Sequence, residues 1–118
     1  MTTLSVLVVE DDTMIGTLLS EMLEEMGHVV CAIATTEEDA IAEAARHKPD
    51  LMIIDQHLRQ GNGMSAMEKI LRNGRIPCVF MSGAPLDVPS DMQLLRKPFL
   101  EMDLVRAIRL VIASSAVR

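Results

Sequence analysis

A chain of 118 residues that is 49% apolar can build one hydrophobic core of single-domain size. Its net charge of −6, from 17 acidic and 11 basic side chains, argues against direct binding to nucleic acid, which needs a basic surface. No signal peptide precedes the first apolar run, and no run reaches the roughly 18 residues of a membrane span, so we expect a cytoplasmic protein that does not enter a membrane.

The apolar residues switch repeatedly between strand-like runs and helical spacing. From Leu4 to Val9 the chain is apolar apart from Ser5, which predicts a buried strand, and the next apolar residues recur at helical spacing up to Met26. Gly27 is expected to close this first helix. The alternation continues and predicts, in order, a strand over 29–34, a helix over about 37–46, a strand over 51–55, a helix over about 64–72, a strand over 76–81, a short strand over 92–95 and a last helix after Lys97 and Pro98, with Pro98 suited to its first turn.

Alternating strands and helices, with strands that are apolar throughout, indicate a parallel sheet covered by helices on both faces. Five such strands predict a small, doubly wound α/β fold. The segment 84–91 contains two prolines and is expected to form a loop or a single helical turn. Cys31 and Cys78 lie inside apolar runs without a closely spaced partner, so we expect two buried, reduced thiols and neither a disulfide nor a zinc site.

The polar residues that end the apolar runs fall at equivalent points of the predicted sheet. They follow the first, third, fourth and fifth strands, and the carboxyl ends of parallel strands share one edge, where such folds bind ligands. Each residue alone has an ordinary explanation, such as a helix cap for Asp12 or a turn for Ser82. Their common placement indicates a single site, which comprises Glu10, Asp11, Asp12, Asp55, Ser82 and Lys97.

The charge of this site favours a bound cation. Two like charges about 4 Å apart repel by roughly 4 kcal/mol at an effective dielectric of about 20, and the site has four carboxylates against one ammonium group. Carboxylates with little else suit a hard ion such as Mg²⁺. With that ion, Asp55 can act as a nucleophile towards a phosphoryl group, while Lys97 neutralises the phosphoryl oxygens and Ser82 hydrogen-bonds the product. The chain has no Gly-rich ATP-binding loop, so the donor must be another protein or a small activated phosphate.

Four short motifs resemble those of the response-regulator receiver domains, the CheY-like family. They are Val8-Val9-Glu10-Asp11-Asp12, Ile53-Ile54-Asp55-Gln56-His57-Leu58 with Gly63 further on, Phe80-Met81-Ser82-Gly83, and Lys97-Pro98-Phe99. The resemblance covers Leu4 to about Ile112 and implies a flavodoxin-like, five-stranded parallel sheet in the order 2-1-3-4-5. It also implies one receiver domain over residues 1–118, with its core at about 4–113 and no output domain.

The resemblance assigns a role to each position of the site. Asp55 matches the phosphoryl-accepting aspartate, Ser82 the switch hydroxyl and Lys97 the lysine that pairs with the phosphoryl group. The implied Mg²⁺ ligands are Asp11 directly, Glu10 through water, Asp55, and the backbone carbonyl of His57.

The function implied in this way is that of a single-domain response regulator in a two-component phosphorelay. Such a chain is a signalling domain that assists its own phosphorylation and slow dephosphorylation, and is not otherwise an enzyme. The implied partners are a histidine kinase or a histidine phosphotransfer protein, docked on the first helix near Ile15 and Leu18. The sequence leaves open whether the phosphorylated chain binds a target protein or serves as a phosphate reservoir.

Three features depart from the usual receiver pattern. Arg59 stands where most receivers have proline, Leu94 replaces the usual tyrosine or phenylalanine, and the segment before Lys97 is too short for a full fourth helix. They resemble a subgroup of mostly stand-alone receivers with a Pro-Phe-x-Phe-Ala-Thr-Gly-Tyr fingerprint, which reads Pro-Cys-Val-Phe-Met-Ser-Gly-Ala over residues 77–84. In that subgroup the loop after the fourth strand is mobile, so we expect the signal to pass through residues 84–91.

Other functions remain open on the sequence alone. Asp55-Gln56-His57 with Gly61 is close to the Asp-x-His-x-x-Gly motif of cobalamin-binding domains, although the spacing is one residue too long. A receiver-like interaction module that is never phosphorylated would not need the complete site. A Mg²⁺-dependent phosphatase would need a second aspartate where His57 stands.

Overall fold

The computed structural model describes residues 3–116, which form one parallel sheet flanked by helices. The elements follow in the order β1 (Ser5–Val9), α1 (Thr13–Glu25), β2 (Val29–Ala34), α2 (Glu37–His47), β3 (Leu51–Asp55), α3 (Gly63–Leu71), β4 (Cys78–Ser82), β5 (Gln93–Arg96) and α4 (Glu101–Ala116). The strands pair in parallel in the order β2-β1-β3-β4-β5, which confirms the predicted doubly wound fold. In the described chain no helix lies between β4 and β5, as their short spacing predicted.

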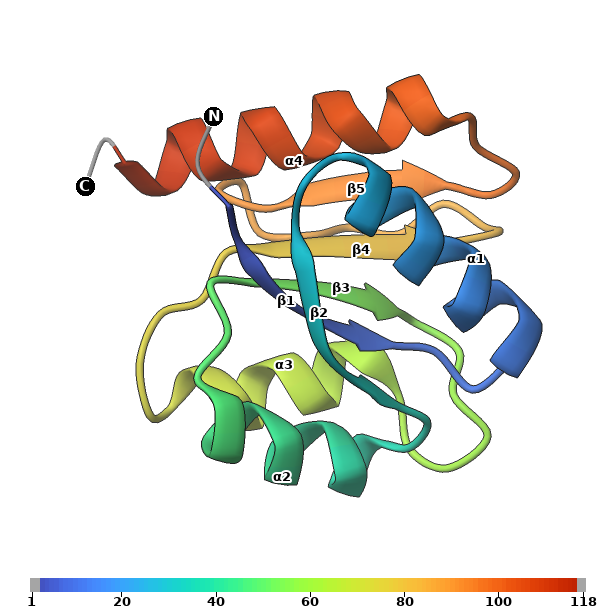
Figure 1. Cartoon of the computed structure of the whole chain (residues 1–118). Coiled ribbons are helices and arrows are strands. Elements are labelled where there is room, and N and C mark those ends of the chain that lie inside the picture. The colour runs from blue at the N-terminus through green and yellow to red at the C-terminus, as the bar shows by residue number, and fades with distance from the viewer. Residues whose placement is uncertain (1–2, 117–118) are drawn as a thin grey trace.

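The sheet separates two hydrophobic cores. Helices α1 and α4 cover one face, and α2 and α3 cover the other (Figure 1). Successive strand residues point to opposite faces, so that Val6 and Val8 of β1 pack with α1 and α4, while Leu7 and Val9 pack with α2 and α3. A central strand buried on both faces must be apolar at every position, which explains the uninterrupted apolar runs. Within residues 3–116 no helix combines the length and the hydropathy that a membrane crossing requires.

The last helix begins later than the sequence predicted. Pro98 is not in the first turn of α4, because the helix starts at Glu101 and Pro98 lies in the segment between β5 and α4. The Asp103 carboxylate accepts a hydrogen bond from the backbone N–H of Leu100 at 2.8 Å. This contact satisfies a backbone donor ahead of the first turn, as in a capping box, and fixes the start of the helix after Leu100.

The two cysteines have different environments. Cys78 is buried in β4, and burial raises the pKa of its thiol to about 12. The expectation of a buried thiol is wrong for Cys31, which is only half-buried because it lies on β2, an edge strand of the sheet. Both thiols are free, and the Cys31 thiol donates to the carbonyl of Val6 at 3.4 Å.

Candidate functional site

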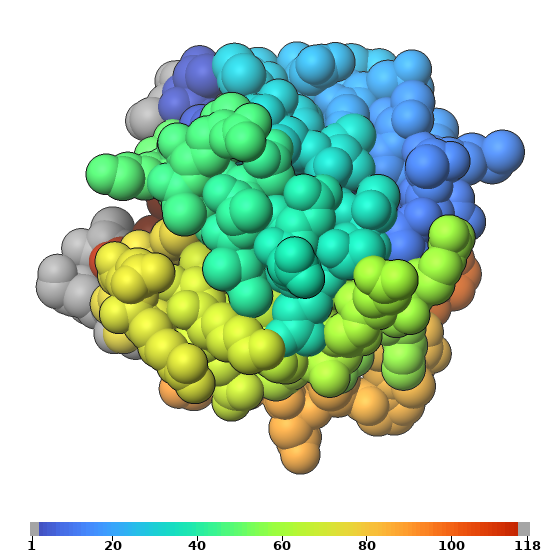
Figure 2. Space-filling view, turned by 90° about the horizontal axis from the view of Figure 1, so that it is seen from below, coloured from blue at the N-terminus to red at the C-terminus, as the bar shows by residue number. Residues whose placement is uncertain are grey.

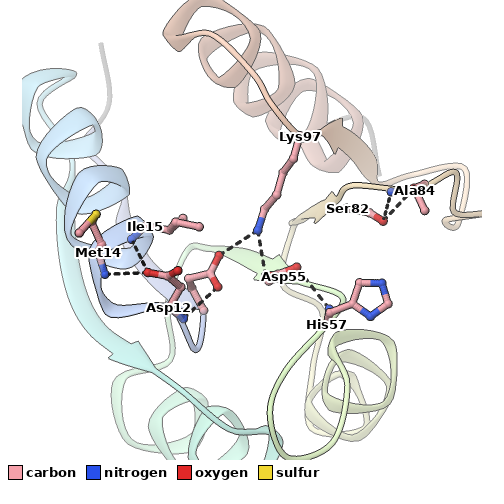
Figure 3. Close-up of polar contacts among 9 residues, drawn as sticks. Asp12, Met14, Ile15, Asp55, His57, Ser82, Ala84 and Lys97 are labelled. Carbon is pink, nitrogen blue, oxygen red and sulfur yellow. Dashed lines mark hydrogen bonds and ion pairs between the residues drawn. The ribbon is translucent and has the colours of Figure 1, made fainter.

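Four strands deliver the predicted site residues to one edge of the sheet. Asp55 and Ser82 are the last residues of β3 and β4, while Glu10 and Lys97 directly follow β1 and β5. In the register of β3 with β4, Asp55 pairs with Met81. Asp55 and Ser82 therefore end their strands within one residue of each other. Figure 3 shows Asp55, Ser82 and Lys97 entering the site from separate segments. The structure therefore brings together residues that lie far apart in the sequence.

The ammonium group of Lys97 joins two buried carboxylates. Its Nζ lies 2.9 Å from Oδ2 of Asp55 and 3.2 Å from Oε1 of Glu10. The Lys97 side chain is 25% exposed, whereas those of Glu10 and Asp55 are 1% and 8% exposed. Burial opposes the charged form of Lys97, but the hydrogen bond to Asp55 and the charges of both carboxylates outweigh it and raise the pKa of the lysine. Lys97 therefore remains a cation at neutral pH.

Glu10 has an unusual protonation equilibrium. Burial of its carboxyl group is the main cause that raises its pKa from 4.5 to about 7, and the charge of Asp55 acts in the same direction. A hydrogen bond from the backbone N–H of Asp12 to Oε2, 3.1 Å long, and the charge of Lys97 partly oppose this shift. Two buried carboxylates thus share one lysine, and the second negative charge is poorly compensated.

The site fits a divalent cation. Glu10, Asp11 and Asp55 each offer a carboxylate oxygen, and these oxygens lie within 4.8 Å of one another. Lys97 balances only one of the three charges, and oxygen ligands with a net negative charge match the preference of Mg²⁺. A cation bound among these oxygens would offset the burial and the charge of Asp55 that raise the pKa of Glu10. Glu10, Asp11 and Asp55 are therefore the residues of this structure that suit Mg²⁺.

The remaining predicted residues have clear partners. Asp12 caps α1, because Oδ1 accepts from the backbone N–H groups of Met14 at 2.9 Å and Ile15 at 3.2 Å, so its ordinary explanation as a helix cap is correct. His57 is exposed, and its backbone N–H donates to Oδ1 of Asp55 at 3.3 Å. The Ser82 hydroxyl donates to the carbonyl of Ala84 at 2.8 Å (Figure 3).

Two residues near the site were missed by sequence reasoning. The Gln56 side chain accepts a hydrogen bond from the backbone N–H of Met64 at 2.9 Å and ties the start of α3 to the end of β3. Glu37, at the start of α2, binds the loop that follows Asp55. In the sequence Glu37 looks like any acidic residue in the first turn of a helix. Its role could not be predicted because its partners lie at least 23 residues away along the chain.

The fold and the site define a doubly wound α/β domain with an acidic cluster and a lysine at the carboxyl ends of its strands. Residues 6–109 match the model of the response regulator receiver domain. The chain therefore belongs to the receiver-domain family of two-component signalling proteins, whose members bind Mg²⁺ at an acidic pocket.

Individual relatives support the same assignment. The chain is 32% identical over 115 residues to the transcriptional regulatory protein PdtaR of Mycobacterium tuberculosis, covering 92% of this chain and 56% of PdtaR. It is 30% identical over 101 residues to the phyllosphere-induced regulator PhyR of Methylorubrum extorquens, covering 80% of this chain and 38% of PhyR. The chain thus spans about half the length of these curated relatives or less.

Solved structures of receivers have the same fold. The REC domain of the PhyR response regulator from Erythrobacter litoralis superposes with a TM-score of 0.86 at 28% identity, covering 94% of this chain and 91% of that domain. PhyR from Brucella abortus gives a TM-score of 0.85 at 28% identity, covering 98% of this chain and 51% of that protein.

Proposed function

We propose that this receiver accepts a phosphoryl group on Asp55 within a two-component phosphorelay. The observation that carries the proposal is the contact of Lys97 with Asp55 and Glu10 at the end of the sheet. A lysine held against the acceptor carboxylate stands ready to compensate charge on a phosphoryl group placed there. Membership of the receiver family favours this function over the cobalamin-binding and phosphatase alternatives.

The chemistry requires one bond to form and one to break. An oxygen of the Asp55 carboxylate attacks the phosphorus of the donor, and the bond from phosphorus to the leaving group breaks, giving an acyl phosphate. Asp11, Glu10, Asp55 and the His57 carbonyl would hold Mg²⁺, which when bound supplies charge compensation for the phosphoryl oxygens. Lys97 keeps its proton throughout and acts as a fixed positive charge.

Output is proposed to pass through the loop after β4. The phosphoryl group carries about −1.5 to −2 charges in place of the single charge of the Asp55 carboxylate, and its oxygens would draw the Ser82 hydroxyl towards them. The Ser82 hydroxyl must then give up two hydrogen bonds with Ala84. It donates one to the Ala84 carbonyl and accepts the other from the Ala84 backbone N–H at 3.2 Å. The loss of both contacts would allow residues 84–91 to rearrange. Two points remain predictions. One is the subgroup that residues 77–84 resemble, and the other is that this loop carries the output in place of the usual aromatic side chain at the position of Leu94.

The proposed phosphodonor is a histidine kinase or a histidine phosphotransfer protein. Met14 and Leu18 on α1 are 74% and 54% exposed, and Ile15 beside them is half-buried. They give a partner an apolar surface on the helix that directly follows the acidic residues 10–12. The PhyR of Bartonella quintana is described as an anti-anti-sigma factor, so a regulator of transcription is one kind of downstream partner to test. A phosphate-reservoir role is the alternative output.

The decisive experiment is intact mass spectrometry after incubation with acetyl phosphate and Mg²⁺. We expect the parent chain to gain one phosphoryl group, and Asp55→Asn and an EDTA-treated parent to gain none. Asp87→Asn, which changes an exposed aspartate in the loop after β4, serves as the matched control and should be labelled like the parent. If the parent is not labelled, titration with beryllofluoride and Mg²⁺ will separate a site that needs its own phosphodonor from an interaction module that is never phosphorylated.

The loop hypothesis has its own test. Amide NMR spectra with and without beryllofluoride and Mg²⁺ should show the largest changes outside the site at residues 84–91. Unchanged signals from this loop would refute the proposed route through Ser82.

A further inference from the structure

The loop between β3 and α3, residues 56–62, contacts the acceptor residue from both of its ends. At the start of the loop, the backbone N–H of His57 donates to Oδ1 of Asp55 at 3.3 Å. Just after the loop, Gly63 packs so tightly against β3 that a Cβ atom there would lie 2.5 Å from the carbonyl oxygen of Asp55. The first contact holds the Asp55 carboxylate and the second its backbone, so a shift of this loop would change the surroundings of the acceptor from two sides.

Glu37, from the start of α2, binds this loop through both its side chain and its backbone. Its Oε1 accepts from the backbone N–H of Asn62 at 3.0 Å, and its Oε2 accepts from the Ser65 hydroxyl at 2.6 Å and pairs with Lys69 Nζ at 2.8 Å. The backbone N–H of Glu37 also donates to the carbonyl of Gln60 at 3.1 Å. In Figure 2 the yellow-green surface of the loop lies directly against the blue-green start of α2.

The packing around Glu37 leaves little space for other arrangements. Its side chain is only 12% exposed. A Cβ atom at Gly61, whose φ is +83°, would lie 2.4 Å from the Glu37 side chain, so the close approach requires glycine at that position. The hydrogen bond from Lys69, followed by those from Ser65 and Asn62, lowers the pKa of Glu37 to about 2. Glu37 is therefore ionised at every pH at which the protein is expected to function, and its carboxylate can accept from all three donors.

The other hydrogen bonds of the loop act at its two ends. A proline would fix one backbone angle at position 59, but Arg59 leaves that angle free. Other contacts of the loop are the bridge between His57 and Asn62 and the packing of Leu58 against the core beneath α2 and α3. Backbone N–H groups also donate from Gln56 to the Met81 carbonyl, from Met64 to Gln56 Oε1, from Gly63 to the Gln56 carbonyl and from Ser65 to Asn62 Oδ1. These hydrogen bonds anchor the first and last residues of the loop to β4, to the start of α3 and to each other, whereas Glu37 also binds Gln60 inside the loop and joins it to α2.

We propose that Glu37 is a positioning residue for the phosphorylation of Asp55: it fixes the β3–α3 loop from α2, and the loop in turn orients the acceptor carboxylate. This inference rests on the proposed function of Asp55. A displacement of about 1 Å at a reacting group can reduce a rate about 100-fold, so partial release of the loop should give a smaller but measurable loss.

The test compares Glu37→Gln with Glu38→Gln, a change at the exposed neighbouring position of the same helix turn. Glutamine at position 37 can keep the contact with Asn62 but cannot act as a charged acceptor for both Ser65 and Lys69. We expect initial labelling by acetyl phosphate at saturating Mg²⁺ to fall about 10-fold per folded molecule in Glu37→Gln, and to stay within about twofold of the parent in Glu38→Gln. Lys69→Met, which keeps the contacts with Asn62 and Ser65, should have an intermediate effect.

Two further readouts separate positioning from general stability. Circular dichroism gives the folded fraction of each variant, so that labelling is compared only among folded molecules. Amide NMR signals of Asp55 and His57 should shift in Glu37→Gln before Mg²⁺ is added, and the Mg²⁺ concentration needed for half-saturation should rise several-fold. A Glu37→Gln variant that melts earlier but shows parent-like labelling, amide signals and Mg²⁺ affinity would overturn the inference. If the parent is never labelled, the proposed function fails, and the amide and Mg²⁺ readouts still decide whether Glu37 positions the loop.

Discussion

Replacement of Glu10 by glutamine should change how the stability of the metal-free protein depends on pH. The pKa of Glu10 is raised from 4.5 to about 7, chiefly by burial. Each pKa unit corresponds to about 1.4 kcal/mol, so the shift corresponds to about 3 kcal/mol of folding free energy. Between these two pH values the folded state retains a proton that the unfolded state has lost. The stability of the parent should therefore fall as the pH rises from about 4.5 to 7 and then level off.

Glu10→Gln removes this titration and keeps the shape of the side chain. We expect the free energy of unfolding of the parent, relative to that of the variant, to fall by about 2–3 kcal/mol between about pH 5 and pH 8. Because the chain contains neither Trp nor Tyr, unfolding by guanidinium chloride should be followed by far-ultraviolet circular dichroism. Glu38→Gln, at an exposed position, should follow the parent. Parallel pH profiles for the parent and Glu10→Gln would refute the reasoning.

Addition of Mg²⁺ gives a second arm of the same experiment. A cation that binds only the folded state with ionised carboxylates stabilises it by mass action, most strongly above pH 7, where it should offset the loss in the parent. Glu10→Gln should gain less from Mg²⁺ because it lacks one of the clustered carboxylates. An equal gain in both proteins would exclude Glu10 from the metal site.

Three other outcomes follow from local geometry. Lys97→Met leaves the Glu10 and Asp55 carboxylates without their shared cation, and denaturant unfolding at neutral pH without Mg²⁺ should show a loss of roughly 2–4 kcal/mol; no loss would contradict the electrostatic account. Gly63→Ala places a Cβ atom 2.5 Å from the Asp55 carbonyl oxygen and should cost about 1–3 kcal/mol in the same assay, whereas Gly83→Ala meets no atom within 4 Å and should cost much less. Alkylation by iodoacetamide, read by mass spectrometry, should modify half-buried Cys31 well before Cys78, whose thiol is buried with a pKa of about 12, and the reverse order would contradict the assigned burial.

The strands could be predicted well because a strand that is buried on both faces is apolar at every position. Leu51 to Ile54 could only be a doubly covered strand, and the polar residue that ends it, Asp55, falls at the edge where such sheets bind ligands. That rule is enough to place Lys97 beside Asp55, although the two residues are 42 positions apart. The expected gathering of the acidic cluster follows from strand order alone.

Features that depend on side-chain contacts were harder to predict. The start of α4 was placed too early because the hydrogen bond from the Leu100 N–H to the Asp103 carboxylate determines it. The sequence permits several such caps and does not show which one forms. Glu37 was missed because its hydrogen bonds run to a loop and a helix that are adjacent only in the folded chain. Cys31 has an apolar neighbourhood in the sequence, and only the strand order reveals that it lies at the edge of the sheet.

The absence of a helix between β4 and β5 limits how far the segment that joins these two strands can move. Parallel strands need a connection that runs back along the full strand length, which usually takes a dozen or more residues. Residues 83–92 make this return as a short tether that is anchored at Ser82 and Gln93. Fully extended, such a tether reaches roughly 33 Å, and a large part of that reach is needed for the return path. A partner that binds this loop would therefore recognise a local rearrangement of a few residues. The tether is too short for a large rigid-body movement across the surface.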